Sequence, residues 1–344
     1  MSSKKEKIIK ITNEGLKNNH IENYSDNINW TPEVFKKMTD IEIKSKTDEE
    51  LVFDIKGVDP TLANTLRRIM IAEVPTMAIE TVIINQNTSI IPDEVLAHRL
   101  GLIPILADAN DFVEKKEEEE FNDKNSMKFT LKVKCYTDKN GKIINENIFS
   151  KDLIFVPQGE QEKKFYNTQT KKYSIGLVHD DILINKLTSG MEIDLECYCV
   201  KGIGRTHAKW SPVCTAYYKL INKINILEEI SGEDAEELRQ LCPKGVFIVN
   251  KKGVSEVGNV RNCTSCRECI RQEKFKDLIE LGKIADHYEF HIESVGMYKP
   301  ESIFLRAINV LKEKIKVWHE LLNEKAKIKK NVLLHIKIIK INFI

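Results

Sequence analysis

Four cysteines have the residue type and spacing that most clearly indicate chemistry in this sequence. Cys242 precedes a proline, and Cys263, Cys266 and Cys269 follow at two-residue gaps. Three thiolates spaced in this way on one loop can bind three corners of a cubane, and a Cys-Pro elsewhere in the chain can supply the fourth ligand. The pattern therefore predicts a 4Fe-4S or 3Fe-4S cluster held by these four residues.

Zinc is the alternative metal for the same residues, because four thiolates also form a closed tetrahedral zinc site. Zinc sites more often use two separate cysteine pairs, and this spacing does not divide into pairs, so iron–sulfur is favoured. Unligated thiols are a third interpretation, which the clustering of the cysteines around Gly245, Gly253 and Gly258 disfavours. Cys197 and Cys199 lie two apart on an expected strand, which is more typical of core or surface thiols.

Composition and charge limit the possible functions. The chain has 344 residues, is 42% hydrophobic and 31% charged, and carries a formal net charge of +1. These values are ordinary for a soluble protein of two or more domains, and they argue against direct sequence-specific DNA binding. There is no apolar run of signal-peptide length at the N-terminus and no uncharged stretch that could span a membrane. We therefore expect an intracellular protein without a disulfide framework.

The motifs of common enzyme classes are missing from the sequence. There is no GxGxxG after a strand, no GxxxxGK(S/T) and no HExxH, and no carboxylate set suits two-metal phosphoryl transfer. His207 lacks a serine, cysteine or carboxylate grouping that would support nucleophilic chemistry. We therefore expect no catalytic residues and a chain that is not an enzyme by itself. The hypothesis of another class is an iron–sulfur redox protein built on the cysteine loop.

A compact αβ unit is predicted around residues 57–104. Asp59 is a good N-cap, Pro60 suits the first helical position, and Pro75 ends the helix. Four apolar residues at helical spacing form one face of this helix: Leu62, Leu66, Ile69 and Met70. Further elements are expected at Leu51–Ile55 (strand), Thr81–Ile84 (strand) and Pro92–Gly101 (helix).

A long helix is predicted to begin at Pro300, after an alternating strand at Tyr288–Ser294. Six apolar residues in it recur at spacings of 4, 3, 4, 3 and 4: Phe304, Ile308, Leu311, Ile315, Trp318 and Leu322. Such a seam needs a partner helix, or it packs within the chain, where Ile303 and Ala307 widen the stripe. The tail beyond Lys325 is apolar and β-prone, which predicts an added strand or an unstructured extension and indicates no function.

Four segments within residues 57–104 carry a family resemblance. Asn64–Ile69, Ala72–Ala78, Asp93-Glu94 and Ala97–Pro104 closely resemble the α-like subunits of multisubunit RNA polymerases. This family comprises the bacterial α subunit, the archaeal D subunit and the eukaryotic third-largest-subunit family. The resemblance implies that the first helix pairs with its counterpart in a smaller α-like subunit. It also implies that the dimer is the platform for the two largest subunits, which carry the catalysis.

The resemblance further implies an α+β fold, in which a discontinuous αβ dimerisation domain is interrupted by a β-rich insert domain and a small ferredoxin-like cysteine domain. The expected boundaries are a flexible N-terminal arm at 1–40, the dimerisation domain at 41–81, 203–230 and 279–325, the insert at 82–202, the cysteine domain at 231–278 and a tail at 326–344. In many archaeal D subunits the small domain holds an iron–sulfur cluster, whereas some eukaryotic relatives bind zinc there or have lost the cysteines. A cluster in this chain would have a structural or assembly-sensing role.

Two groups of contact residues follow from the resemblance. The interface with the smaller subunit is expected to use Leu62, Leu66, Ile69, Met70, Phe304, Ile308, Leu311, Ile315 and Trp318. Contacts with a large subunit are expected from Arg67, Arg68, His98, Arg99, His207 and Lys209.

Four segments favour one branch of the family. Glu73–Ala78, Asn87–Ser89, Leu102–Asp108 and Ser211–Tyr218 are most similar to the subunit shared by RNA polymerases I and III. This similarity implies a non-catalytic assembly subunit for the transcription of rRNA, 5S rRNA and tRNA, located in the nucleus, including the nucleolus. The alternative within the family is the third-largest subunit of RNA polymerase II.

Overall fold

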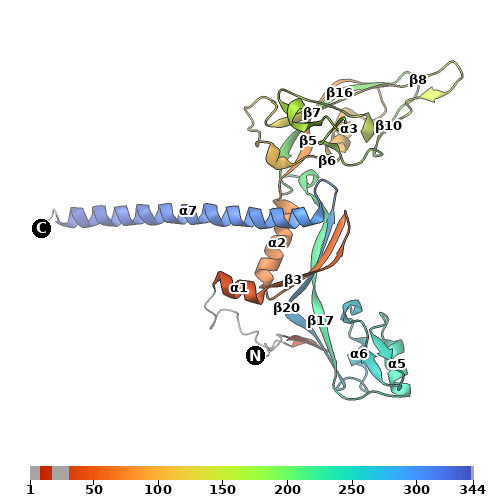
Figure 1. Cartoon of the computed structure of the whole chain (residues 1–344), viewed down its shortest axis with the longest axis vertical. Coiled ribbons are helices and arrows are strands. Elements are labelled where there is room, and N and C mark those ends of the chain that lie inside the picture. The colour runs from red at the N-terminus through yellow and green to blue at the C-terminus, as the bar shows by residue number, and fades with distance from the viewer. Residues whose placement is uncertain (1–7, 18–30, 342–344) are drawn as a thin grey trace. The chain divides into compact units, whose positions relative to one another are not determined.

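The computed structural model describes residues 8–17 and 31–341, with side chains described up to residue 325 (Figure 1). The chain forms two compact units, each made of segments that are separate in sequence. The first unit comprises Met1–Thr47, Leu51–Thr65 and Tyr217–His291, and the second comprises Asp48–Glu50, Leu66–Ala216 and Ile292–Ile344. The predicted mixture of helices and sheets is confirmed. The predicted N-terminal arm lies partly outside the described residues.

A six-stranded sheet forms the body of the first unit. Its strands are β1 (Ile8–Thr12), β2 (Gly15–Lys17), β3 (Asp40–Lys46), β4 (Glu50–Lys56), β17 (Val213–Ile226) and β20 (Ile279–Ser294). They are arranged in the order β2-β1-β20-β4-β3, and β17 also pairs with β20. The central strand β20 therefore connects three parts of the chain that are distant in sequence.

The two faces of β20 differ in character, because side chains alternate along a strand. On one face Phe290 stacks on Phe53 of β4, with ring centroids 5.4 Å apart, and Tyr288 is almost fully buried. The other face carries Glu289, which is also buried, with an exposed fraction of 5%. A buried acid needs compensating charges, and Lys219 of β17 and Arg261 of a loop described below supply them.

The cysteines of the predicted cluster lie in a small subregion of the first unit. Its elements are α5 (Glu233–Leu241), β18 (Phe247–Val249), β19 (Ser255–Val257), η4 (Val260–Asn262) and α6 (Glu268–Arg271). The antiparallel strands β18 and β19 form a hairpin in which Gly253 has a φ of +76°, a conformation that favours glycine. Acidic residues occupy the first turn of α5, where the helix dipole stabilises them. Leu238, Phe247 and Phe275 are buried in the local apolar core.

Two helices begin where their capping residues predict. The hydroxyl of Thr31 accepts a hydrogen bond from the Val34 N–H at the start of α1 (Pro32–Met38). The carboxylate of Asp59 accepts one from the Thr61 N–H, at 2.7 Å, at the start of α2 (Pro60–Ala72). Before α2, Gly57 has a φ of +74°, and a Cβ there would collide with the Met38 carbonyl oxygen, so this turn requires glycine.

A four-stranded antiparallel sheet forms the centre of the second unit. Its order is β11 (Ile154–Val156), β7 (Ser126–Lys134), β16 (Glu192–Gly202) and β5 (Thr76–Asn87). The helix α3 (Asp93–Gly101) contributes Leu96 and Leu100 to the apolar core of this unit. Cys197 and Cys199 lie in the same core, which agrees with the prediction that they are core or surface thiols.

Shorter elements complete the second unit. They are β6 (Ile105–Leu106), η1 (Ala109–Asp111), β8 (Tyr136–Thr137), β9 (Ile143–Ile144), β10 (Asn147–Phe149), η2 (Ser150–Asp152), α4 (Gln161–Phe165), β12 (Tyr166–Asn167), β13 (Lys172–Tyr173), β14 (Gly176–Leu177), β15 (Leu183–Lys186) and η3 (Ala208–Trp210). Four two-stranded sheets pair β10 with β15, β12 with β13, β14 with β6 and β8 with β9.

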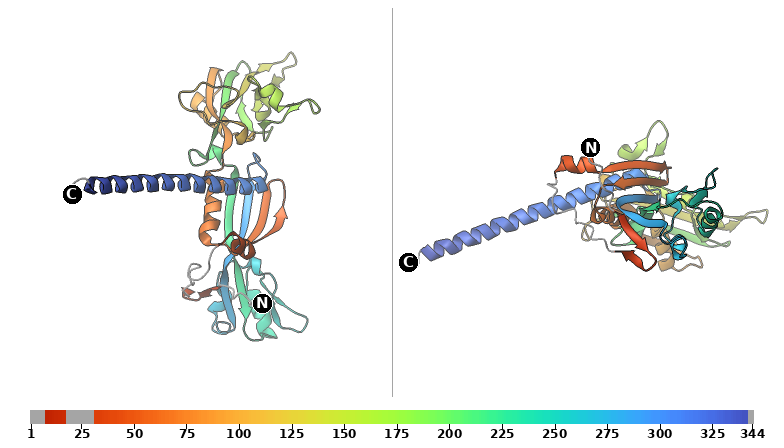
Figure 2. Two further views of the ribbon diagram at one scale, coloured as in Figure 1. Left: turned by 60° about the vertical axis from the view of Figure 1, so that its left-hand side comes forward. Right: turned by 90° about the horizontal axis from the view of Figure 1, so that it is seen from below.

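The last element is α7 (Pro300–Ile341), one helix of 42 residues that both views in Figure 2 show without a break. The prediction of a strand or an unstructured tail beyond Lys325 is wrong for the residues up to Ile341. That segment contains neither proline nor glycine, and extending an existing helix avoids the cost of nucleation. None of the described helices has the length and apolar character needed to cross a membrane.

Side chains near its start attach α7 to the second unit. Ile303 and Ala307 are completely buried. The two terminal guanidinium nitrogens of Arg306 donate to the Asp108 carboxylate, at 3.0 and 2.6 Å, and the same guanidinium lies over the Tyr298 ring. Burial raises the pKa of Asp108, but the hydrogen bonds from Arg306 and the Asn110 N–H, together with the charges of Arg306 and Lys201, outweigh this effect and hold that pKa below its ordinary value.

Candidate functional site

The apolar face of α2 is covered by the chain itself. The exposed fractions of Leu66, Ile69 and Met70 are 6%, 1% and 0%, and Leu62 is half-buried. A partner could reach the first three side chains only if the chain rearranged. Of the four residues that the sequence assigned to an interface on this helix, Leu62 is therefore the one available in the described structure.

The apolar seam of α7 is open along much of its length. Phe304, Ile308 and Leu311 are half-buried, whereas Ile315 and Trp318 are 60% and 63% exposed. The seam continues with Leu322, which is also exposed. An exposed tryptophan within an apolar stripe is typical of a surface that binds another protein.

Two of the six predicted large-subunit contacts are engaged within the second unit. Arg99 on α3 donates to the carbonyl oxygens of Leu183 and Ile184 on β15, at 2.7 and 3.1 Å. Lys209 donates to the Ile79 carbonyl oxygen at 2.8 Å and pairs with Glu80. Its ammonium also lies 4.5 Å from the centre of the Trp210 ring. These two cations therefore stabilise the connection of α3 and η3 to the strands beside them.

The other four predicted contact residues differ in accessibility. Arg68 on α2 is exposed, whereas Arg67 is half-buried and engaged with other groups of the chain. His98 and His207 are exposed, and their rings meet edge to face at 6.4 Å. The Nδ1 atom of His207 accepts a hydrogen bond from the Lys209 N–H, which caps η3. Arg68, His98 and His207 thus remain open to a partner.

The four predicted ligand cysteines border one small cavity in the first unit. Cys242, Cys263, Cys266 and Cys269 line it together with apolar side chains that include Ile224, Val246, Phe247 and Leu281. Burial raises the pKa of the Cys269 thiol to about 12, and the three neighbouring cysteines add to the increase. The structure thus brings together residues separated by up to 27 positions, in surroundings that disfavour thiolates without a cation.

These cysteines fit a soft metal in their chemistry. Sulfur ligands in an apolar enclosure suit zinc or an iron–sulfur cluster. The described residues contain no group of three or more His, Cys, Asp or Glu side chains already arranged to hold a metal ion. All four thiols are free of disulfides. The donor set is therefore present, while ligation would require the side chains to close on the metal.

A group of ionised side chains beside the cysteines was not anticipated from the sequence. Arg261, two residues before Cys263, donates to both carboxylate oxygens of Asp54 on β4, at 3.1 and 2.6 Å, and pairs with Glu289 on β20. The Nε2 atom of His287 lies 3.0 Å from Asp54. Burial raises the pKa of Asp54, but the hydrogen bonds and charge interactions with Arg261 and His287 together outweigh burial and hold that pKa below its ordinary value.

The sequence contains a weak signal for this ionic group. Asp54 interrupts the apolar run of β4, and Glu289 lies in the alternating strand β20. A charged residue within a strand suggests a buried partner, but the partner is distant in the sequence.

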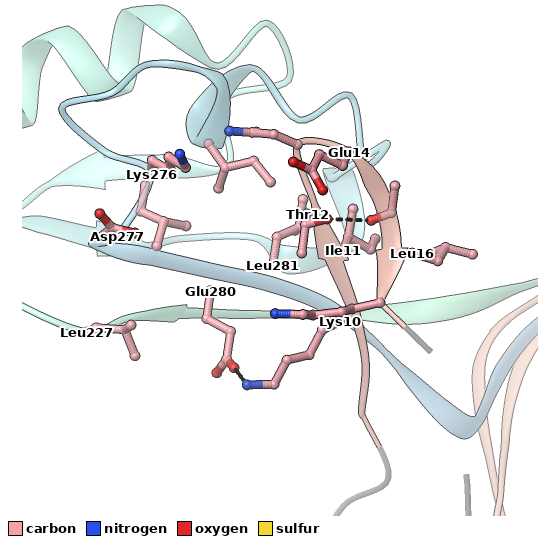
Figure 3. Close-up of a pocket in the computed structure, with 15 residues that line it drawn as sticks. Lys10, Ile11, Thr12, Glu14, Leu16, Leu227, Lys276, Asp277, Glu280 and Leu281 are labelled. Atoms are coloured by element: carbon pink, nitrogen blue, oxygen red, sulfur yellow. Dashed lines mark hydrogen bonds and ion pairs between the residues drawn. The ribbon is translucent and has the colours of Figure 1, made fainter. Parts of the chain in front are cut away.

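A second cavity of the first unit, of about 740 Å³, lies between the β1–β2 hairpin and the start of β20 (Figure 3). Lys10 and Glu280 form an ion pair beside it, and Thr12 donates to the Gly15 carbonyl oxygen at 2.9 Å to close the hairpin. Its lining mixes charged side chains with the exposed Leu16 and Leu227. None of the predicted site residues lines this cavity.

Comparison with known proteins identifies the family. Residues 52–315 match the family model of the RNA polymerase Rpb3/Rpb11 dimerisation domain, which is more than half of the chain. The chain belongs to this family. The resemblance inferred from residues 57–104 is therefore confirmed over a much longer stretch.

Individual relatives agree with this assignment. The chain is 46% identical over 291 residues to subunit rpac1 of DNA-directed RNA polymerases I and III from Dictyostelium discoideum, with 84% of each protein covered. It is 41% identical over 315 residues to RPAC1 of the same two polymerases from Mus musculus, covering 86% of this chain and 90% of the relative. RNA polymerase II subunit rpb3 from D. discoideum is 32% identical over 292 residues, covering 81% and 93%.

Proposed function

We propose that this protein is a non-catalytic assembly subunit of DNA-directed RNA polymerases I and III. The observation that carries the proposal is the 46% identity to the subunit of polymerases I and III from D. discoideum, against 32% for the polymerase II subunit of the same organism. This difference in identity favours the subunit of polymerases I and III over the third-largest subunit of polymerase II. Such a subunit acts in the nucleus, including the nucleolus.

In this proposal the chain pairs with a smaller α-like subunit and presents the dimer to the two largest subunits. The interface comprises Leu62 and the open seam of α7, because these are the predicted interface residues that a partner can reach. Residues 82–202 act as the β-rich insert and residues 231–278 as the cysteine domain. Arg68, His98 and His207 are the candidate contacts with a large subunit.

Reconstitution with the smaller subunit tests the pairing. When the two chains are produced together, size-exclusion chromatography with light scattering should show a 1:1 complex. A chain that remains monomeric in the presence of its partner would contradict the proposal.

We further propose that Cys242, Cys263, Cys266 and Cys269 hold an iron–sulfur cluster of the 4Fe-4S or 3Fe-4S type, or alternatively zinc, in a structural role. The shared apolar cavity and the proximity of the four thiols support this. Metal bound there would stabilise the small core that contains Cys269.

Cys266→Ser is expected to remove the bound metal and to leave the second unit folded. Cys266 is exposed, so the smaller and similar serine side chain costs little packing, but it replaces a soft ligand. Anaerobic purification followed by iron, sulfide and zinc analysis measures the loss. Cys214→Ser, which replaces another exposed cysteine outside the cavity, is the control and should keep the metal. If the unaltered protein contains no iron, sulfide or zinc, the proposal that these four cysteines bind a metal is wrong.

A further inference from the structure

The loop that carries Cys263 has a backbone conformation that requires support. Ser265 and Arg267 have φ values of +58° and +71°, in the left-handed region that side chains with a Cβ disfavour. Such residues persist where the surrounding structure determines them. The source of this support lies in hydrogen bonds to the six-stranded sheet.

On one side, Arg261 ties the loop to two strands. Its guanidinium contacts Asp54 on β4 and Glu289 on β20, whose exposed fractions are only 1% and 5%. Two adjacent buried carboxylates are costly without cations nearby. Lys219 and His291 also contact Glu289, at 2.7 and 2.8 Å. Arg261 differs from them because it bridges both acids and comes from the cysteine loop.

On the other side, Asn222 ties the loop to β17. Its amide Nδ2 donates to the carbonyl oxygen of Cys263, and its Oδ1 accepts from the hydroxyl of Ser265 at 2.9 Å. Asn222 is itself buried, with an exposed fraction of 8%. The loop is thus attached to the sheet at three positions: Arg261, Cys263 and Ser265. All of these residues belong to the first unit.

We propose that Arg261 and Asn222 are positioning residues for the cysteine site, which they fasten to β4, β17 and β20 of the sheet. Groups that orient metal ligands raise metal affinity, and their loss typically costs about 10-fold to 100-fold. Because linkage is reciprocal, metal bound at the cysteines also stabilises these ties to the sheet. The metal part of this proposal rests on the proposed function of the four cysteines, whereas the positioning of Cys263 does not.

Alkylation of the metal-free full chain tests the positioning directly. Arg261→Gln is expected to increase the rate of Cys263 labelling by a maleimide roughly tenfold, since charge-assisted hydrogen bonds are lost. Peptide mapping by mass spectrometry separates this rate from that of Cys266, which is already exposed, and from that of Cys199, which is fully buried in the other unit and reports unfolding there. Circular dichroism of the same samples reports unfolding of the first unit. Asn222→Ala should increase the rate of Cys263 in the same way.

Arg239→Gln is the matched control. It removes the same type of side chain from α5 of the same subregion, where Arg239 pairs with Glu236 on the surface, and it should change no cysteine rate. If Arg261→Gln also accelerates Cys199 or reduces the circular dichroism of the folded chain, the protein has unfolded. The double variant Arg261→Gln with Asp54→Asn then replaces it, because this variant leaves no unpaired carboxylate at position 54. Unchanged Cys263 labelling in either folded variant overturns the proposal.

Titration with Zn²⁺ as the probe metal tests the coupling. The metal-free protein is expected to bind Zn²⁺ about 10-fold to 100-fold more weakly after Arg261→Gln, and Arg239→Gln should bind as the unaltered chain does. If the unaltered chain binds neither zinc nor iron, the proposed metal site fails, while faster Cys263 labelling still supports the positioning role. Equal zinc affinity together with unchanged labelling overturns the role of Arg261.

Discussion

Ile315→Asp combined with Trp318→Asp is expected to abolish pairing with the smaller α-like subunit while the fold of the chain is unchanged. Both side chains are exposed, so a carboxylate is tolerated in the free chain. In the complex each carboxylate would be desolvated in an apolar contact. Loss of two central interface residues at about 2 kcal/mol each corresponds to roughly a thousandfold weaker binding. Isothermal titration calorimetry with the purified partner measures the change.

Glu320→Lys provides the control for this experiment. Glu320 is exposed on α7 and lies two residues from Trp318, which places it on the opposite side of the helix. The charge reversal should leave both binding and folding unchanged. Normal affinity of the double aspartate variant, in a protein with unaltered circular dichroism, would show that the α7 seam does not form the interface.

Met70→Asp should have the largest effect on stability. Met70 has an exposed fraction of 0%, so the substitution removes apolar packing and places an unpaired carboxylate in the interior. We expect a loss of about 4 kcal/mol in the free energy of unfolding, which is a large part of the stability of an ordinary domain. Urea unfolding followed by circular dichroism measures it.

Arg68→Asp, two residues earlier on α2, should change the free energy of unfolding by less than about 0.5 kcal/mol, because Arg68 is exposed. A different result for Met70→Asp would change the role assigned to α2. If Met70→Asp unfolds as the unaltered chain does and loses only the partner, then the apolar face of α2 is available for pairing, as the family resemblance implied.

The contrast between α2 and α7 shows what periodicity can and cannot predict. Asp59 and Pro60 determine the start of α2 locally, so capping chemistry located it correctly. The spacing of Leu66, Ile69 and Met70 indicates an apolar face but not what covers it. The same is true of the α7 seam, which the structure leaves open at Ile315 and Trp318.

The cysteine site illustrates the same limit at longer range. The spacing of Cys263, Cys266 and Cys269 is local, and it predicted the group that borders the cavity. Arg261 and Asp54 are 207 residues apart, and their pairing follows from the fold. No local pattern indicates such a partner. The tail after Lys325 was predicted incorrectly because β-propensity depends strongly on context, whereas an established helix can be extended residue by residue.

Affinity purification of the tagged chain from its own cells tests the central claim most directly. Mass spectrometry of the purified material identifies the subunits that accompany it. We predict recovery of the smaller α-like subunit together with the largest subunits of both polymerase I and polymerase III, and of the polymerase II subunits only at background level. Recovery of polymerase II subunits alone, or of the chain without any polymerase subunit, would contradict it.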